Sequence, residues 1–171
     1  MTFEERVLAL RIVRDKKEFL EHFDQHPQEV ALLTALVLDL APYPSKEYSS
    51  WMLIHLSKAH PNRFDYLYPE LVDLCFRTDD QTVLRNVLNT IIQLKKSKHR
   101  EAEFIDLLLG FIANPKNKVA LQVYSIYILI EFGKRYPELI AEFRQTIDFN
   151  ARNKTAAYTI ARRNFNLNFR E

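Results

Sequence analysis

Residues 67–94 read LYPELVDLCFRTDDQTVLRNVLNTIIQL, and this stretch decides the fold. Apolar residues recur in it at the three- and four-residue spacing of a helix that buries one face. The periodic pattern is interrupted once, by the polar run Arg77–Thr82, in which Asp79 is placed to cap the helix that follows. The stretch therefore predicts two helices joined by a short acidic turn.

Similar turns recur along the chain. Asn114-Pro115-Lys116-Asn117 lies 35 residues after Asp79, and Asn150-Ala151-Arg152-Asn153 lies 36 residues further on. These intervals are close to those of helical-hairpin repeats. We expect four pairs, whose first (A) helices lie near 28–41, 62–77, 101–113 and 137–149. Their second (B) helices are expected near 48–59, 82–98, 118–135 and 153–164.

Three residues of the quoted stretch give it a family likeness. With Pro69 in its first helix, Asp79 in its turn and Arg85 in its second helix, it resembles the HEAT-repeat consensus. The later units have Ala120 and Ala156 where the arginine belongs, so another α-α repeat class stays open. The resemblance implies an all-α, right-handed α-α superhelix of about four HEAT-like hairpins with terminal capping helices. It would form a single domain, 1–171, with an N-terminal cap at 1–25, repeats at 26–155 and a C-terminal cap and tail at 156–171.

Composition supports helices and excludes several functional classes. The chain has two glycines, Gly110 and Gly133, where average usage of about 7% would give roughly twelve. Two glycines cannot supply several tight β-hairpins or a phosphate-binding loop. A net charge of +2 and a pI near 8.6 are low for a dedicated nucleic-acid-binding domain.

Candidate catalytic and metal-binding residues are few. His22 and His26 share a helical spacing, but a zinc site needs three or four ligands, and Pro27 ends the helix. We therefore interpret His22 and His26 as a solvated helix end. Cys75, the single cysteine, lies in the apolar run 71–76 and is predicted to be a core residue in a reducing compartment. No catalytic residue, cofactor or metal is predicted.

The sequence gives no sign of membrane insertion or export. Its longest uncharged run, 119–130, is twelve residues long, whereas a membrane span needs about 20. The start of the chain, with Glu4 and Glu5, is acidic and unlike a signal peptide. We expect a cytoplasmic protein with no membrane partner.

Charge is distributed unequally between the two helix classes. The four A spans contain 11 acidic and 3 basic residues, whereas the four B spans contain 11 basic residues and one acid, Glu131. Cations at the C-terminal turns of B helices complement the helix dipole, which is one explanation. In HEAT-like arrays the B helices line the concave surface, so a functional basic edge at Lys58, Lys96 and Lys134 is the other.

Superposing the B helices gives the candidate binding residues. A shift of 38 residues aligns Leu53 with Ile91 and Leu129, and the same shift aligns the three lysines of the basic edge. These leucines and the isoleucine are expected in the core, together with the columns Ile54/Ile92/Ile130 and Leu56/Leu94/Phe132. Counting back from each lysine at helical spacing gives three polar-aromatic stripes: Tyr48-Trp51-His55-Lys58, Asn86-Asn89-Gln93-Lys96 and Tyr124-Tyr127-Glu131-Lys134.

The stripes predict a partner-binding surface because Trp and Tyr dominate recognition patches. The alternative is that these aromatic side chains pack against a neighbouring repeat or the termini. Our leading prediction is a non-enzymatic adaptor that holds a protein segment, or a second copy of the chain, on its B-helix face. A nucleic-acid-binding protein resembling HEAT-like DNA glycosylases is the alternative, and a small enzyme without recognisable motifs is a third class.

The C-terminal residues 164–169 alternate polar and apolar with period two. This pattern predicts an extended tail that docks its apolar side chains on one side. A frayed helix that uses Phe165 and Phe169 is the alternative.

Overall fold

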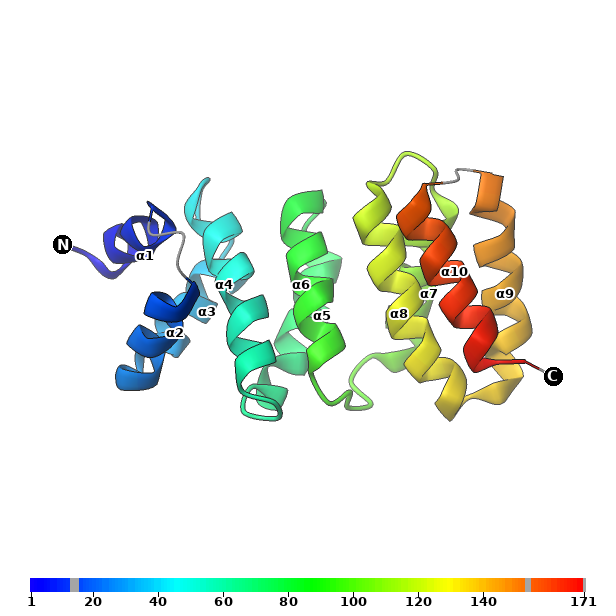
Figure 1. The fold of residues 1–171 in the computed structure, drawn as a ribbon, viewed down its shortest axis with the longest axis horizontal. Helices are drawn as coiled ribbons and strands as arrows, with labels where there is room; N and C mark the ends of the chain where they lie inside the picture. The colour runs from blue at the N-terminus through cyan, green and yellow to red at the C-terminus, as the bar shows by residue number, and fades with distance from the viewer. Residues whose placement is uncertain (13–15, 153–154, 171) are drawn as a thin grey trace. The chain divides into compact units, whose positions relative to one another are not determined.

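The computed structural model describes residues 1–12, 16–152 and 155–170, and over these residues the secondary structure is helical, with no strand (Figure 1). The prediction of an all-α chain is confirmed. The chain divides into two compact units, Met1–Lys96 and Ser97–Glu171. That the two form a single repeat domain stays a prediction.

The first unit consists of two helical hairpins preceded by a pair of short helices (Figure 1). Its α-helices are α1 (Phe3–Ile12), α2 (Lys16–Gln25), α3 (Glu29–Leu38), α4 (Ser45–Ala59), α5 (Tyr68–Arg77) and α6 (Gln81–Gln93), with a 3-10 turn at Asp65–Leu67. The B helices α4 and α6 pack side by side, while α1 and α2 pack against α4. Fully buried Leu33, Met52, Leu71, Val87 and Ile91 contribute to the core of this unit.

The second unit repeats the arrangement with two further hairpins. Its α-helices are α7 (Glu101–Ala113), α8 (Val119–Arg135), α9 (Ile140–Phe149) and α10 (Ala156–Asn168), with 3-10 turns at Pro137–Leu139 and Asn150–Arg152. Helix α8 packs against both α7 and α10, and α9 packs against α7 and α10. The aromatic rings of Phe104, Phe132, Phe143 and Phe165 are buried in its core.

The acidic turn caps α6 through a different residue from the one predicted. The side chain of Asp80, not Asp79, accepts hydrogen bonds from the backbone amides of Thr82 (2.9 Å) and Val83 (3.2 Å). Lys46 at the start of α4 lies 2.9 Å from the same carboxylate. Asp80 therefore caps its own helix and also ties it to the neighbouring hairpin.

Most helix boundaries lie close to the predicted ones, with two larger differences. The predicted A helix 62–77 begins at Tyr68, because a 3-10 turn occupies the residues before it. The predicted B helix 82–98 ends at Gln93, since Leu94 adopts an extended backbone. Residues 153–154, where the last B helix was expected to begin, lie outside the described residues.

The prediction of an extended C-terminal tail is wrong, and the helical alternative is correct. Helix α10 continues to Asn168. Phe165 is fully buried, and its ring centroid lies 4.9 Å from that of Phe169, one turn further on. The Phe169 ring packs against Gly133 of α8, where any larger residue would collide with it. The contact between Phe165 and Phe169, which lie four residues apart on one side of the helix, favours a helix over the extended backbone that the period of two suggests.

Candidate functional site

The first predicted stripe lies on α4 with the expected exposure. Tyr48, Trp51 and His55 are half-buried and Lys58 is exposed, whereas Leu53 is buried. The stripes on α6 and α8 show the same contrast: Asn89 and Tyr127 are half-buried, and the aligned Ile91 and Leu129 are fully buried. Ile92, expected in the core, is only half-buried. The phase of the 38-residue alignment is therefore confirmed, while the binding role of the stripes stays a prediction.

Trp51 is the centre of an aromatic cluster between α4 and α2. Its ring centroid lies 5.7 Å from that of Phe19 and 4.4 Å from that of His55, which meets it edge-on. Phe19, on α2, is almost completely buried. The interpretation that the aromatic residues pack against the termini is thus correct in part for Trp51, which contacts α2 but stays half-buried.

His55 lies in a setting that disfavours its protonation. Burial lowers the pKa of its imidazole below the ordinary value, and the positive charges of Lys16 and Lys58 lower this pKa further. Its Nε2 atom is buried and has no hydrogen-bond partner within the described part of the chain. At neutral pH His55 is therefore an uncharged aromatic neighbour of Trp51.

Asn86 differs from the other predicted site residues because it is buried. Its side-chain amide donates hydrogen bonds to the Oγ atom of Ser50 (2.9 Å) and to the backbone carbonyl of Glu47 (3.3 Å). Both acceptors belong to α4. The assignment of Asn86 to a partner-binding surface is corrected: the residue joins α4 to α6 and is enclosed by them.

The other three residues of the α6 stripe are not fully buried, and they lie on, or just beyond the end of, the helix that packs next to the Trp51-bearing α4. Asn89, Gln93 and Lys96 are half-buried, and their helix packs directly against α4. We call the seven residues of these two helices the α4–α6 patch: Tyr48, Trp51, His55, Lys58, Asn89, Gln93 and Lys96.

The stripe on α8 belongs to the second unit and is shared with α10. The hydroxyl of Tyr127 accepts a hydrogen bond of 3.4 Å from the side-chain amide of Asn164. Glu131 and Lys134 are exposed and form an ion pair with each other at 3.1 Å. Tyr124 is half-buried. The α8 stripe is therefore engaged in intramolecular contacts along much of its length.

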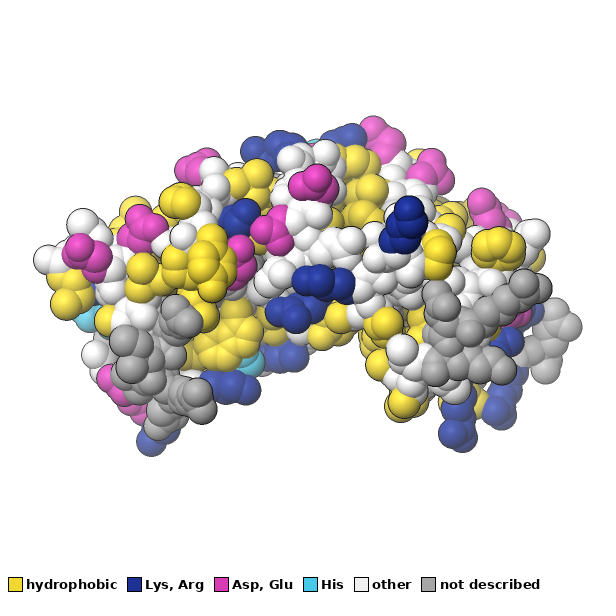
Figure 2. Space-filling model, turned by 90° about the horizontal axis from the view of Figure 1, so that it is seen from above, with side chains coloured by type: hydrophobic (Ala, Val, Ile, Leu, Met, Phe, Trp, Pro, Cys, Tyr) yellow, Lys and Arg dark blue, Asp and Glu magenta, His cyan; other side chains and the backbone are white. Residues whose placement is uncertain are grey.

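Two of the three lysines of the basic edge, Lys96 and Lys134, have local partners, and so do other B-helix cations. The Lys96 ammonium group donates to the backbone carbonyls of Ile92 (3.2 Å) and Leu94 (3.1 Å) at the end of α6. Arg135 pairs with Glu101, and Arg162 pairs with Asp148 at 2.7 Å. Seen from above, as in Figure 2, the described side chains at the helix ends mix acidic, basic and apolar types. These contacts favour the structural explanation of the B-helix charges.

The most polar cluster of the first unit had no signal in the sequence. The nearly buried carboxylate of Glu29 on α3 lies 2.8 Å from Nε2 of His22 on α2 and 2.9 Å from the guanidinium of Arg6 on α1. The hydrogen bond with His22 lowers the pKa of Glu29 more than burial raises it, and the Arg6 charge lowers it further. The interpretation of His22 as part of a solvated helix end is therefore wrong.

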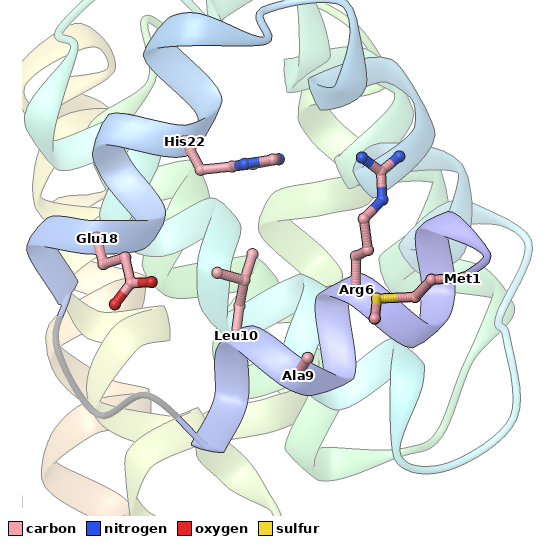
Figure 3. A pocket seen from close by; sticks show the side chains of 6 residues that line it. All are labelled: Met1, Arg6, Ala9, Leu10, Glu18 and His22. Carbon is pink, nitrogen blue, oxygen red and sulfur yellow. The ribbon is translucent and has the colours of Figure 1, made fainter.

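A small pocket lies between α1 and α2 beside this cluster. Its volume is about 220 Å³, and Figure 3 shows the His22 side chain directed toward the guanidinium end of Arg6. Met1, Ala9 and Leu10 make its wall largely apolar, and Glu18 lies at its edge. Because Arg6 and His22 already bind Glu29, neither side chain is free to bind a ligand in this pocket.

Cys75 is a core residue, as predicted. It is 2% exposed, and burial raises the pKa of its thiol far above the ordinary value. A thiol that keeps its proton at physiological pH is a poor nucleophile.

Comparison with known proteins gives one family and no individual relative. Neither the curated proteins nor the solved structures include a match to the chain. Among the described residues, none of the helices combines the length and apolar character that a membrane crossing requires. The family model of the HEAT repeat domain matches residues 8–168, which cover most of both units. The chain therefore belongs to the HEAT repeat domain family, whose helical scaffolds often mediate protein interactions.

Proposed function

We propose that this protein is a non-enzymatic adaptor whose α4–α6 patch holds a segment of a protein partner. Membership of a HEAT repeat family supports a helical scaffold that works by binding. The observation that carries the proposal is the position of Trp51. Its ring is half-buried on a helix whose core-facing residues are completely enclosed, and Phe19 and His55 support it from the side.

The chemistry of the patch suits a peptide chain. A rigid aromatic ring supplies apolar contact area at low entropic cost. The neighbouring side chains of Asn89 and Gln93 carry both hydrogen-bond donors and acceptors, which peptide groups require. We therefore expect a partner segment that places an apolar side chain against Trp51 and backbone groups near α6.

Trp51 also provides the assay, because it is the single tryptophan of the chain. A random peptide library is displayed on phage and selected on the folded wild-type protein alone. Synthetic versions of the selected peptides are then titrated while Trp51 emission is recorded. We expect a change in Trp51 emission with wild-type protein, and an affinity for Trp51→Ala, measured by calorimetry, weaker by about 2 kcal/mol or more.

A matched control distinguishes the patch from the rest of the surface. Tyr66→Ala removes a side chain that is 64% exposed and lies outside the patch, so it should bind the selected peptides as wild type does. Selected peptides that bind Trp51→Ala with wild-type affinity would contradict the proposal. Tight binding of duplex DNA that weakens steeply with salt would instead favour the nucleic-acid alternative.

A further inference from the structure

The second unit contains a groove that the proposed function does not use. It has a volume of about 580 Å³ and runs between the start of α7 and the start of α9. Ala102, Ile105 and Leu139 form its apolar part. Its polar residues are Lys98, Arg100, Glu101, Glu103, Asp106, Tyr136 and Glu142.

Acidic residues outnumber basic ones along this groove: Glu101, Glu103, Asp106 and Glu142 line it together with Lys98 and Arg100. Glu101 is occupied by Arg135 and by the hydroxyl of Tyr136, which donates to it at 2.6 Å. Asp106 and Glu142, in contrast, are exposed and have no ion-pair partner among the described residues. An occupant of the groove should therefore present apolar side chains together with Lys or Arg.

Helix α10 carries that combination on the side directed away from its own unit. Tyr158, Ala161 and Phe165 are buried where α10 packs against α8 and α9. The opposite side has large apolar groups at Ile160 (56% exposed) and Leu167 (41% exposed). Arg163 lies between Ile160 and Leu167 in the sequence, Arg170 follows Leu167, and both arginines are exposed. Positions 160, 163 and 167 share one helical face, and position 170 continues that spacing beyond the helix end.

We propose that the α7–α9 groove binds the outer side of α10 from a second copy of this chain. Leu167 and Ile160 would contact the apolar part of the groove, and Arg163 would approach Asp106 and Glu142. The outer side of α10 faces away from its own unit, so it cannot fill the groove of the same molecule. A single helix in a groove buries a small area, so the association is expected to be weak and sensitive to salt.

The groove and the outer side of α10 are different surfaces, so the contact is heterologous. Each chain can therefore bind the α10 of one neighbour in its groove while its own α10 binds in the groove of another. This property permits a charge-exchange experiment. One variant carries Arg163→Glu with Arg170→Glu, and the other carries Asp106→Lys with Glu142→Lys. All four side chains are exposed, and circular dichroism verifies that each variant folds.

Sedimentation equilibrium of the full chain measures the association. Wild type should associate at chain concentrations up to about 200 µM, and each double variant alone should associate at least about tenfold more weakly. An equimolar mixture of the two variants should regain association, because the exchanged charges are complementary in both directions. Lys116→Glu, an exposed cation in the α7–α8 turn, is the matched control and should behave as wild type.

Three results would overturn the proposal. Wild type that remains monomeric up to about 200 µM would show that a second copy does not occupy the groove. Association that persists in both double variants would place the contact on another surface. Double variants that dissociate but do not recover on mixing would show that the two surfaces do not meet each other.

Discussion

Trp51 and Ile91 lie on adjacent helices but in different surroundings, and this difference predicts different energetic roles. Ile91 is fully buried in the core of the first unit, so Ile91→Ala should reduce the free energy of unfolding by roughly 2–5 kcal/mol. Trp51 is only half-buried, and its indole contacts Phe19 and His55. Trp51→Ala should therefore cost less stability than Ile91→Ala. Urea denaturation followed by circular dichroism compares the two variants, and an equal or larger loss for Trp51→Ala would identify Trp51 as a core residue.

The edge-on contact between His55 and Trp51 predicts a spectroscopic effect of pH. A protonated imidazole next to an indole ring quenches its fluorescence, so Trp51 emission should fall as the solution is acidified. Because burial and the charges of Lys16 and Lys58 lower the pKa of His55, the midpoint should lie below the ordinary value of 6.5. His55→Gln should abolish this transition, while His26→Gln, whose ring contacts His22, should preserve it. A midpoint above pH 6.5 would contradict the burial of His55.

At the scale of elements, the two glycines form a matched pair. Gly110 lies inside α7, where an added methyl group would meet nothing within 4 Å. Gly110→Ala should therefore raise the free energy of unfolding by about 1 kcal/mol, since alanine favours the helix. At Gly133 in α8, the same group would lie 2.7 Å from Cζ of Phe169 and must displace its ring. Gly133→Ala should gain less than Gly110→Ala in wild type.

The double-variant cycle with Phe169→Ala tests this explanation. In that background the obstacle is absent, so Gly133→Ala should stabilise α8 by about 1 kcal/mol, as Gly110→Ala does. Thermal unfolding of the four proteins gives the coupling energy between positions 133 and 169. A coupling energy near zero would show that the Phe169 ring moves aside at no cost.

Helix positions could be predicted from the sequence because apolar periodicity is a local property, and the 38-residue alignment gave the correct core-facing side of α4, α6 and α8. The sequence pattern predicts a cap at Asp79, but the adjacent Asp80 satisfies the same pattern, and only backbone geometry selects Asp80. Residues 164–169 are too few to distinguish an extended segment, in which side chains alternate with period two, from a helix, in which side chains four residues apart are in contact. The burial of Asn86 and of Glu29 depends on neighbouring helices, so no local pattern could show it.

At the scale of the whole molecule, three ionisable groups make stability depend on pH in the same direction. The pKa of Glu29 is lowered mainly by its hydrogen bond with His22. Burial would raise the pKa of Asp80, but hydrogen bonds from Lys46 and from the backbone amides at the start of α6 outweigh it and lower this pKa. The pKa of His55 is lowered as well. The unfolded chain therefore binds more protons than the folded chain in acid.

The free energy of unfolding should consequently decrease as pH falls. The contribution of His55 is complete above its ordinary value of 6.5 and is lost as the pH falls from there through its folded pKa. The contributions of Glu29 and Asp80 are lost in the same way below 4.5 and 3.8. Urea denaturation between about pH 7.5 and pH 2.5 measures this dependence. His55→Gln should reduce the change in the free energy of unfolding near and below pH 6.5, and Glu29→Gln should reduce the change below pH 4.5. A free energy of unfolding that increases on acidification would contradict the assignment of this dependence to these three groups.

The contacts of Glu29 with Arg6 and His22 have a consequence for the dynamics of the first unit. Helices α1 and α2 are each ten residues long, too short to persist without contacts to the rest of the unit. Arg6 of α1 and His22 of α2 share one acceptor, so loss of that carboxylate weakens the attachment of both helices. Phe19 of α2 also lies against Trp51. The opening equilibrium that governs amide hydrogen exchange in α2 therefore also sets the fraction of time for which the Phe19 side chain is away from the indole ring.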